Sequence, residues 1–227
     1  AVVSVVAPGY APSPERRVAI PAPPGTASAD FELSPGGRLT GTVVERGTRR
    51  PLAGAAVALE GGPDTEAVPV RNEVATDGEG RFELEGLPDR PGSLMASAPG
   101  HHARIAAVPP VGEGERRGPL TVELTPVAAG EEPRVELAGI GAGLQKRGEV
   151  LVVTMAVPGG GAAEAGLAPG DEVVAIDGQP VAKLTLGEAI PLLRGPEGTV
   201  VTLSVVKGGD PGRATITVPV LRSLVRG

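Results

Sequence analysis

Few residues in this sequence combine the types and the spacing that enzyme chemistry needs. His101 and His102 could bind a metal ion, but no third ligand is in view, and we interpret the pair as the exposed end of a strand. Asp171 and Asp177 could serve as a paired acid and base, yet each stands in a glycine-containing turn that explains its presence. No serine has a motif nearby that would supply a general base. We therefore expect no catalytic site, no metal site and no cofactor in this chain.

Two glycine-rich segments could in principle bind ligands. Gly159-Gly160-Gly161 lacks both the Gly-Lys-Ser/Thr ending of a phosphate loop and the G-x-G-x-x-G spacing, so we expect a flexible turn. Asp77-Gly78-Glu79-Gly80 lacks the twelve-residue ligand series of a calcium loop. We interpret it as a tight hairpin turn, in which Asp-Gly supplies the residues that tolerate a positive φ.

The composition indicates a β-rich chain with many turns. Glycine and proline contribute 35 and 25 of the 227 residues, and they stand between short alternating runs of Val, Leu, Ile and Ala. The net charge of −6 carries no basic stripe, which argues against nucleic acid as a partner. No apolar run approaches the ~18 residues that span a bilayer, so we expect no membrane insertion. The chain has no cysteine and begins with Ala, and we expect it to be part of a longer protein.

Short strands follow one another in the first half of the chain. Alternating or apolar runs cover residues 39–44, 55–60, 94–98, 105–108 and 120–124, and a hairpin is expected at residues 76–82. About seven strands with turns every eight to twelve residues are typical of a β-sandwich.

An internal repeat indicates where this domain begins. Ala7-Pro8-Gly9-Tyr10 is similar to Ala98-Pro99-Gly100-His101, and Phe31-Glu32-Leu33-Ser34-Pro35 is similar to Val122-Glu123-Leu124-Thr125-Pro126. Both pairs are offset by 91 residues, so we interpret residues 1–36 as the C-terminal remnant of a preceding repeat and residues 37–127 as a complete copy. We expect the remnant to be loosely held or to borrow an edge of the next sandwich.

The complete copy resembles the carboxypeptidase regulatory-like family, which has a transthyretin-like (prealbumin-like) β-sandwich. The stretches that carry the resemblance are Gly41-Thr42-Val43, Pro51-Leu52-Ala53-Gly54-Ala55-Ala56-Val57, Thr76-Asp77-Gly78-Glu79-Gly80-Arg81-Phe82 and Ala98-Pro99-Gly100-His101. The resemblance implies an accessory module without catalytic residues. It also implies a location in the cell envelope or outside the cell, in the periplasm or on the outer surface of a bacterium.

The pattern changes after a polar linker at residues 128–133. Strands are expected at residues 150–156, 172–176, 200–207 and 214–220, and a short helix at residues 162–165. A second helix begins at Thr185, where Thr185 and Glu188 form a capping box. Pro191 lies inside that helix and should kink or loosen it, because proline lacks the backbone donor.

This order resembles bacterial PDZ domains, in particular those of carboxy-terminal processing proteases. The resemblance covers residues 134–223, with a tail at 224–227, and implies a small β-barrel or sandwich with two helices, so the whole chain is mainly β. The matching stretches are Gly139-Ile140-Gly141-Ala142, Ala162-Ala163-Glu164-Ala165-Gly166-Leu167-Ala168-Pro169-Gly170-Asp171, Val174-Ala175-Ile176-Asp177-Gly178, Glu188-Ala189 and Leu193-Arg194-Gly195-Pro196-Glu197-Gly198-Thr199. In such bacterial domains the last strand, here residues 214–220, replaces the usual first one.

The resemblance also implies a peptide-binding groove. A peptide C-terminus would add as a strand between residues 142–145 and the helix at residues 186–194, with its carboxylate in a nest of backbone amides at residues 139–142. The implied pocket for the last side chain consists of Ile140, Ala142, Leu144 and Leu193, and an apolar Leu186 favours an apolar residue two positions earlier. The implied peptide-binding residues are Gly139, Ile140, Gly141, Ala142, Gly143, Leu144, Leu186, Ala189, Ile190 and Leu193. Small Ala142, where phenylalanine is common, and Pro191 in the helix depart from the usual pattern.

The sequence therefore predicts a non-catalytic module that binds apolar peptide or protein C-termini, with the sandwich repeats as an envelope or extracellular spacer. Two alternatives remain open. The chain could be the regulatory, substrate-binding part of a processing protease whose catalytic domain lies outside it, or a fragment of an adhesin stalk.

Overall fold

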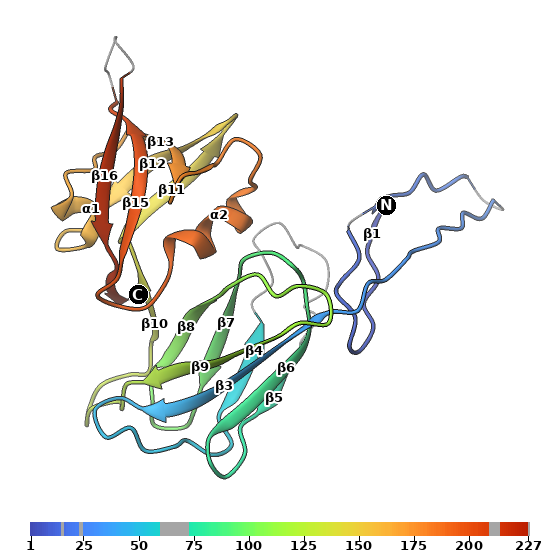
Figure 1. The fold of residues 1–227 in the computed structure, drawn as a ribbon, viewed down its shortest axis with the longest axis horizontal. Helices are drawn as coiled ribbons and strands as arrows, with labels where there is room; N and C mark the ends of the chain where they lie inside the picture. Colours follow the sequence, from blue (N-terminus) through green and yellow to red (C-terminus); the bar gives the residue numbers. More distant parts are fainter. Residues whose placement is uncertain (15, 23–24, 60–72, 209–213, 227) are drawn as a thin grey trace.

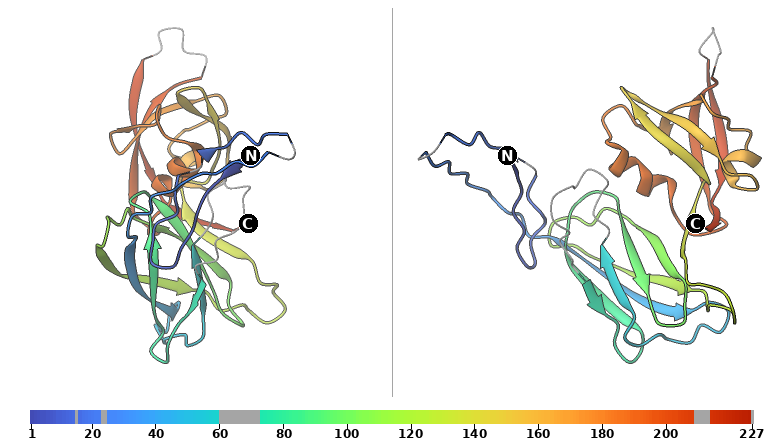
Figure 2. Two further views of the ribbon diagram at one scale, coloured as in Figure 1. Left: turned by 90° about the vertical axis from the view of Figure 1, so that its right-hand side faces the viewer. Right: turned by 180° about the vertical axis from the view of Figure 1, so that it is seen from behind.

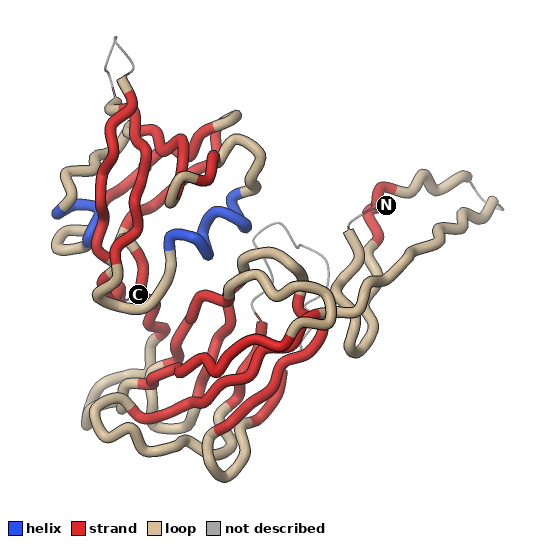
Figure 3. Tube along the Cα trace, in the orientation of Figure 1, coloured by secondary structure: helices blue, strands red, loops and turns tan. Residues whose placement is uncertain are grey.

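The computed structural model describes residues 1–14, 16–22, 25–59, 73–208 and 214–226. They form a β-sandwich, a second β-rich domain at the C-terminal end, and an N-terminal hairpin that projects away from both (Figures 1 and 2). Strands dominate and helices are short (Figure 3), in agreement with the mainly β fold class predicted from the sequence. Within the described residues, neither helix is long and apolar enough to cross a membrane.

The sandwich consists of two sheets. The three-stranded sheet has the order β6-β3-β9 and contains β3 (Gly37–Glu45), β6 (Arg81–Leu87) and β9 (Arg116–Leu124). The facing sheet runs β8-β7-β4-β5 and contains β4 (Ala56–Leu59), β5 (Glu73–Ala75), β7 (Gly92–Ser97) and β8 (Ala103–Val108). These strands cover the apolar runs that the sequence indicated, except for Ala55 and Ala98 at the ends of two runs and Glu60, which lies outside the described residues.

The core of the sandwich lies between the two sheets and is aliphatic apart from one ring. Leu39, Val43, Leu84 and Leu94 are fully buried there, and Phe82 packs among them. Alternate residues of β3 and β6 point to this core, as the period of two in the sequence requires.

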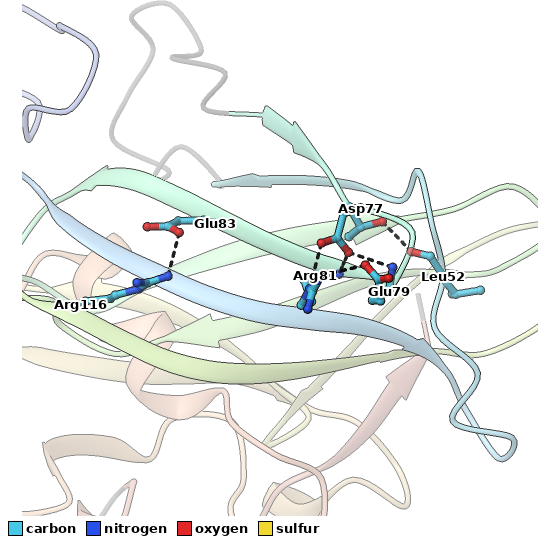
Figure 4. A network of polar contacts seen from close by, with 7 residues as sticks. Leu52, Asp77, Glu79, Arg81, Glu83 and Arg116 are labelled. Atoms are coloured by element: carbon cyan, nitrogen blue, oxygen red, sulfur yellow. Dashed lines mark hydrogen bonds and ion pairs between the residues drawn. The ribbon is translucent and has the colours of Figure 1, made fainter.

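The hairpin turn before β6 uses a different residue from the one expected. The positive φ falls on Gly80, at +71°, and not on Asp77 or Gly78. Asp77 contributes its side chain instead: Oδ1 accepts hydrogen bonds from the amides of Glu79 and Arg81, and Oδ2 accepts one from Arg81 Nε (Figure 4). The turn at Asp77-Gly78 is thus stabilised by the aspartate side chain, because an aspartate can accept a hydrogen bond from the backbone amide two residues further along the chain.

Residues 1–36 borrow no edge of the sandwich. Among their described residues, β1 (Val2–Val3) and β2 (Arg16–Arg17) form a separate two-stranded sheet. Contact with the sandwich is made near Gly86, where an added Cβ would lie 2.8 Å from the carbonyl oxygen of Tyr10. Of the two alternatives expected for this segment, loose attachment or a borrowed sandwich edge, the second is not found among its described residues, where the hairpin satisfies part of its own backbone.

The corner at the end of this hairpin has the same hydrogen bonds as the corner at the end of the sandwich. The amides of Tyr10, Ala11 and Gly36 donate to the carbonyls of Ala7, Ser34 and Gly9 respectively. Exactly equivalent bonds at the 91-residue offset join His101 to Ala98, His102 to Thr125 and Val127 to Gly100. The two corners therefore share one backbone geometry.

The C-terminal domain has a five-stranded sheet in the order β11-β12-β13-β15-β16, with β14 paired to β13. Its strands are β11 (Ala142–Arg147), β12 (Val150–Ala156), β13 (Glu172–Ile176), β14 (Gln179–Pro180), β15 (Val200–Val206) and β16 (Thr215–Leu221), and its helices are α1 (Gly161–Glu164) and α2 (Leu186–Leu193). A separate apolar core includes Leu151, Val173, Ile176 and Leu203. The expected strands and both helices are present to within a residue or so at each end.

One strand between the domains was not foreseen. β10 (Val135–Gly139) pairs in parallel with β8 of the sandwich and antiparallel with β17 (Ser223–Arg226) at the end of the chain. The sandwich sheet therefore extends to β17-β10-β8-β7-β4-β5, across the domain boundary. A continuous backbone ladder, rather than a flexible linker alone, joins the two domains.

Candidate peptide-binding groove

The candidate carboxylate loop lies at the point where β10 leaves the sandwich sheet. Gly139 is the last residue of β10, paired with Ser223, and Ala142 is the first residue of β11, paired with Ala156. Between them the Ile140 and Gly141 carbonyls accept hydrogen bonds from the amides of Ala162 and Val157. Both carbonyls are thus engaged within the domain, and a carboxylate-binding nest would use the amides of the same loop.

Gly141 is required at its place for two reasons. Its φ of +68° lies in the left-handed region, and an added Cβ would lie 3.1 Å from the Cα of Gly160. The expected turn is present at residues 158–160 and leads directly into α1. Gly161 is constrained by packing, because a Cβ there would lie 1.8 Å from the carbonyl oxygen of Leu221 in β16, so glycine lets α1 pack against that strand.

β11 lies at the edge of its sheet and is the strand to which a peptide would add. It pairs on one side with β12, with a register shift between Gly143 and Leu144. Lys146 Nζ donates to the carbonyl of Val181, which ties the far end of β11 to the segment leading into α2. An edge strand presents unpaired backbone groups, and these are what β-augmentation uses.

The helix α2 forms the other wall and is held at both ends. At its start, Thr185 Oγ1 accepts from the amide of Glu188 and Glu188 Oε2 accepts from the amide of Thr185, so the capping box predicted from the sequence is confirmed. The helix continues across Pro191, which is buried. A proline within an eight-residue helix thus packs into the domain without ending the helix.

Arg222 holds the C-terminal end of α2, and sequence reasoning missed it. Its guanidinium donates to the carbonyls of Leu192 and Leu193, at 2.9 and 3.2 Å, and to Thr199 and Val200. Burial lowers the pKa of Arg222, and Asp177 nearby opposes that shift. A cation at the last helical carbonyls is favourable because these carry the negative end of the helix dipole. Arg222 lies 29 residues beyond the end of the helix in the sequence, where no local pattern points to this role.

The implied pocket residues fall into two groups. Ile140, Ala189 and Leu193 belong to the buried core, with Ile140 and Leu193 only 3% and 4% exposed. Ala142, Leu144 and Leu186 are half-buried and pack on that core from outside. The half-buried residues are therefore the ones placed to contact a ligand side chain, whereas the buried ones support them from below.

The candidate groove lies next to the sandwich. α2 packs beside β7 and β8 and lies between the C-terminal sheet and the sandwich (Figures 1 and 3). Arg194, directly after the helix, donates from Nη1 to Ser93 Oγ of β7 at 2.9 Å. The Cγ of Arg194 is also 3.8 Å from where a Cβ of Gly139 would be. The carboxylate loop, the helix end and the sandwich thus meet at one place.

The other residues with possible chemistry have structural roles. The interpretation of His101-His102 as an exposed strand end was wrong: His102 is 1% exposed, and the Nε2 atom of His101 lies 3.2 Å from Glu45 Oε2. Asp171 is buried and accepts from Lys207 Nζ and from the amides of Ala168 and Gly208. Burial alone would raise the pKa of Asp171, but these donors outweigh it and lower the pKa.

Metal binding finds no support in the part of the chain that the structure describes. No group of three His, Asp or Glu side chains converges there on a point that could hold an ion.

Comparisons with known proteins assign both domains. A carboxypeptidase regulatory-like domain matches residues 38–125, and a PDZ domain matches residues 152–207. Over 67 residues, or 30% of this chain, the sequence is 42% identical to carboxyl-terminal-processing peptidase 2, chloroplastic, of Arabidopsis thaliana, and over 80 residues (35%) it is 35% identical to a probable CtpA-like serine protease of Staphylococcus haemolyticus. These matches cover 13% and 16% of the two relatives.

Among solved structures, the PDZ domain of a carboxy-terminal protease from Vibrio cholerae in complex with peptide matches 40% of this chain and 99% of its own, with 30% identity and a TM-score of 0.38. The chain therefore carries a carboxypeptidase regulatory-like domain followed by a PDZ domain similar to those of carboxy-terminal processing proteases. The curated relatives are proteases, but the chain spans only a small part of their length. Both families found here are non-catalytic domains.

Proposed function

We propose that this chain binds the free C-terminus of a polypeptide in the groove between β11 and α2. The observation that carries the proposal is the loop at residues 139–142, with its carbonyls held by Ala162 and Val157, at the start of an edge strand. The peptide would pair with β11 and place its carboxylate on the loop amides. The half-buried Ala142, Leu144 and Leu186 give the groove an apolar lining, so we propose an apolar final residue and an apolar residue two positions earlier.

The sandwich would serve as a rigid spacer that fixes the direction of the groove. The β8–β10 pairing and the Arg194–Ser93 hydrogen bond support this role, because both connect the loop region to the sandwich. We also infer that residues 1–36 are the end of a preceding sandwich repeat, on the ground of the shared corner hydrogen bonds. As for most members of the sandwich family, we propose a location in the cell envelope or outside the cell.

A peptide library with free and amidated C-termini tests the proposal. We expect micromolar affinity for free acids with aliphatic or aromatic ends, about −8 kcal/mol, and several-fold weaker binding of the amides because the nest then loses its charged acceptor. Leu186→His should shift the preference toward Ser or Thr two residues before the end, since histidine can bond a hydroxyl. Equal binding of acids and amides would contradict recognition of a C-terminus.

The names of the relatives favour a second candidate, the regulatory part of a processing protease. In that case the groove would hold the C-terminus of a substrate for a protease domain elsewhere in the parent protein. The coding sequence around this segment tests it: a serine protease domain alongside residues 1–227 would support the second candidate. A run of further sandwich repeats without such a domain would support the spacer.

A further inference from the structure

A cleft of about 500 Å³ lies at the junction of the two domains, apart from the peptide groove. The sandwich contributes β8, β9 and the turn after β3, and the PDZ domain contributes residues 195–198 after α2. Three arginines line it, Arg46, Arg49 and Arg104, beside an apolar wall that includes Ala106 and Leu120. Clefts of this size at domain interfaces are the usual places for small ligands.

Arg104 is the residue whose bonding is incomplete. It stands on β8 opposite Glu136 of β10, and its Nη1 atom is buried without a hydrogen-bond partner among the described residues. Burial, and next the charge of Arg46, lower the pKa of Arg104, so the glutamates around it do not fully compensate its charge. A buried N–H donor without an acceptor costs free energy, and an acceptor that arrives there is correspondingly favoured.

The same junction contains two more donors of this kind. His102 Nδ1 accepts from the amide of Arg134, which assigns the proton of a neutral ring to Nε2. This Nε2 and the Nε of Arg134 are buried and also lack hydrogen-bond partners within the described part of the chain, although Glu131 Oε2 lies 3.4 Å from the histidine nitrogen. Among the described residues, all buried side-chain polar atoms without a hydrogen-bond partner are thus nitrogen atoms at this β8–β10 junction. These nitrogen atoms lack hydrogen-bond acceptors.

The other two arginines of the cleft are paired but accessible. Arg49 bonds Glu123 at 2.9 Å with its side chain 68% exposed, and Arg46 pairs with Glu197 of the PDZ domain across the domain boundary. Exposed ion pairs of this kind are weak, so an incoming anion can share or replace their glutamates.

We propose that this cleft binds a small organic oxyanion, with its carboxylate or phosphate group on Arg104 and its apolar part against Ala106 and Leu120. A guanidinium is planar and can donate two parallel hydrogen bonds to a carboxylate or to a phosphate group. Arg46 and Arg49 stand at the same cleft and provide a second contact for a dianion. Because the walls come from both domains, a bound ligand also connects the sandwich to the PDZ domain.

Titration of the full 227-residue chain tests the proposal. The probes are phenyl phosphate and benzoate, which distinguish a phosphate from a carboxylate group. Neutral benzyl alcohol, which has the ring without a charged group, is the control ligand. We expect saturable one-to-one binding of at least one anion by calorimetry and no binding of the alcohol.

The Arg104→Gln variant should bind the anion at least tenfold more weakly. The matched control is Arg116→Gln, which changes an exposed arginine of β9 whose partner Glu83 lies outside the cleft (Figure 4). This variant should leave affinity unchanged.

A second measurement avoids dependence on variants that could misfold. Amide chemical shifts of the unaltered chain should move for Ile105, Ala106 and Leu120 as the anion is added. Shifts confined to residues 139–142 would place the anion on the carboxylate loop instead and overturn the proposal. Binding of neither anion at millimolar concentration in low salt would overturn it as well, and would mean that ordered water satisfies Arg104.

Discussion

Replacing Gly141 with alanine tests whether the loop at residues 139–142 binds the peptide carboxylate, as distinct from its contribution to the stability of the domain. The residue has a φ of +68°, where an L-residue costs about 1–2 kcal/mol, and the new Cβ would lie 3.1 Å from the Cα of Gly160. The loop must therefore shift, and the amides at residues 140–142 turn with it. A hydrogen bond to a charged group contributes about 1.5–3 kcal/mol, so losing one should weaken a free-acid peptide by about tenfold or more.

Gly148 provides the matched control at the other end of β11. Its φ is +57°, but nothing lies within 4 Å of an added Cβ. Gly148→Ala should therefore cost a similar 1–2 kcal/mol of unfolding free energy and leave peptide affinity unchanged. Fluorescence anisotropy with a labelled peptide ending in leucine, as acid and as amide, measures affinity, and urea unfolding measures stability. If the two variants bind the acid equally well, or equally poorly, the loop does not hold the carboxylate.

Three further outcomes are expected. Asp171→Asn should lower the unfolding free energy by about 2 kcal/mol in urea titrations, because the carboxylate accepts three hydrogen bonds, one of them from Lys207; an unchanged midpoint would contradict this. Hydrogen bonds from Thr48, Arg50 and His101 lower the pKa of Glu45 from 4.5 to about 2, so its stabilisation is complete above pH 4.5 and is lost as the pH falls toward 2. Glu45→Gln should flatten the stability profile over that range in acid titrations, and a profile as steep as before would exclude Glu45 as a cause. Deleting residues 1–36, which touch the sandwich mainly near Gly86, should shift the thermal midpoint of the remainder by less than about 5 °C, or roughly 1 kcal/mol, and a larger drop by calorimetry would show that the hairpin supports the sandwich.

Features fixed by local pattern could be predicted from the sequence. Alternating apolar residues indicated strands such as β3, because a strand exposes its two faces with a period of two. The Thr185–Glu188 capping box fixed the start of α2, because its bonds join residues three apart. The Asp177-Gly178 turn has φ values of +46° and +80°, as expected of an Asp-Gly pair.

Features that depend on distant partners could not be predicted in this way. Residues 135–139 became β10 only because the edge of β8 was there to pair with, and their own alternation is too short to indicate it. Arg222 became the cap of α2, and His102 became buried, because the fold brought α2 and Arg134 to them. The candidate groove shows the same division: the sequence supplied its candidate residues through their resemblance to those of PDZ domains. Only the tertiary structure decided that Ile140, Ala189 and Leu193 are core while Ala142, Leu144 and Leu186 are half-buried, because burial depends on what packs on each side chain.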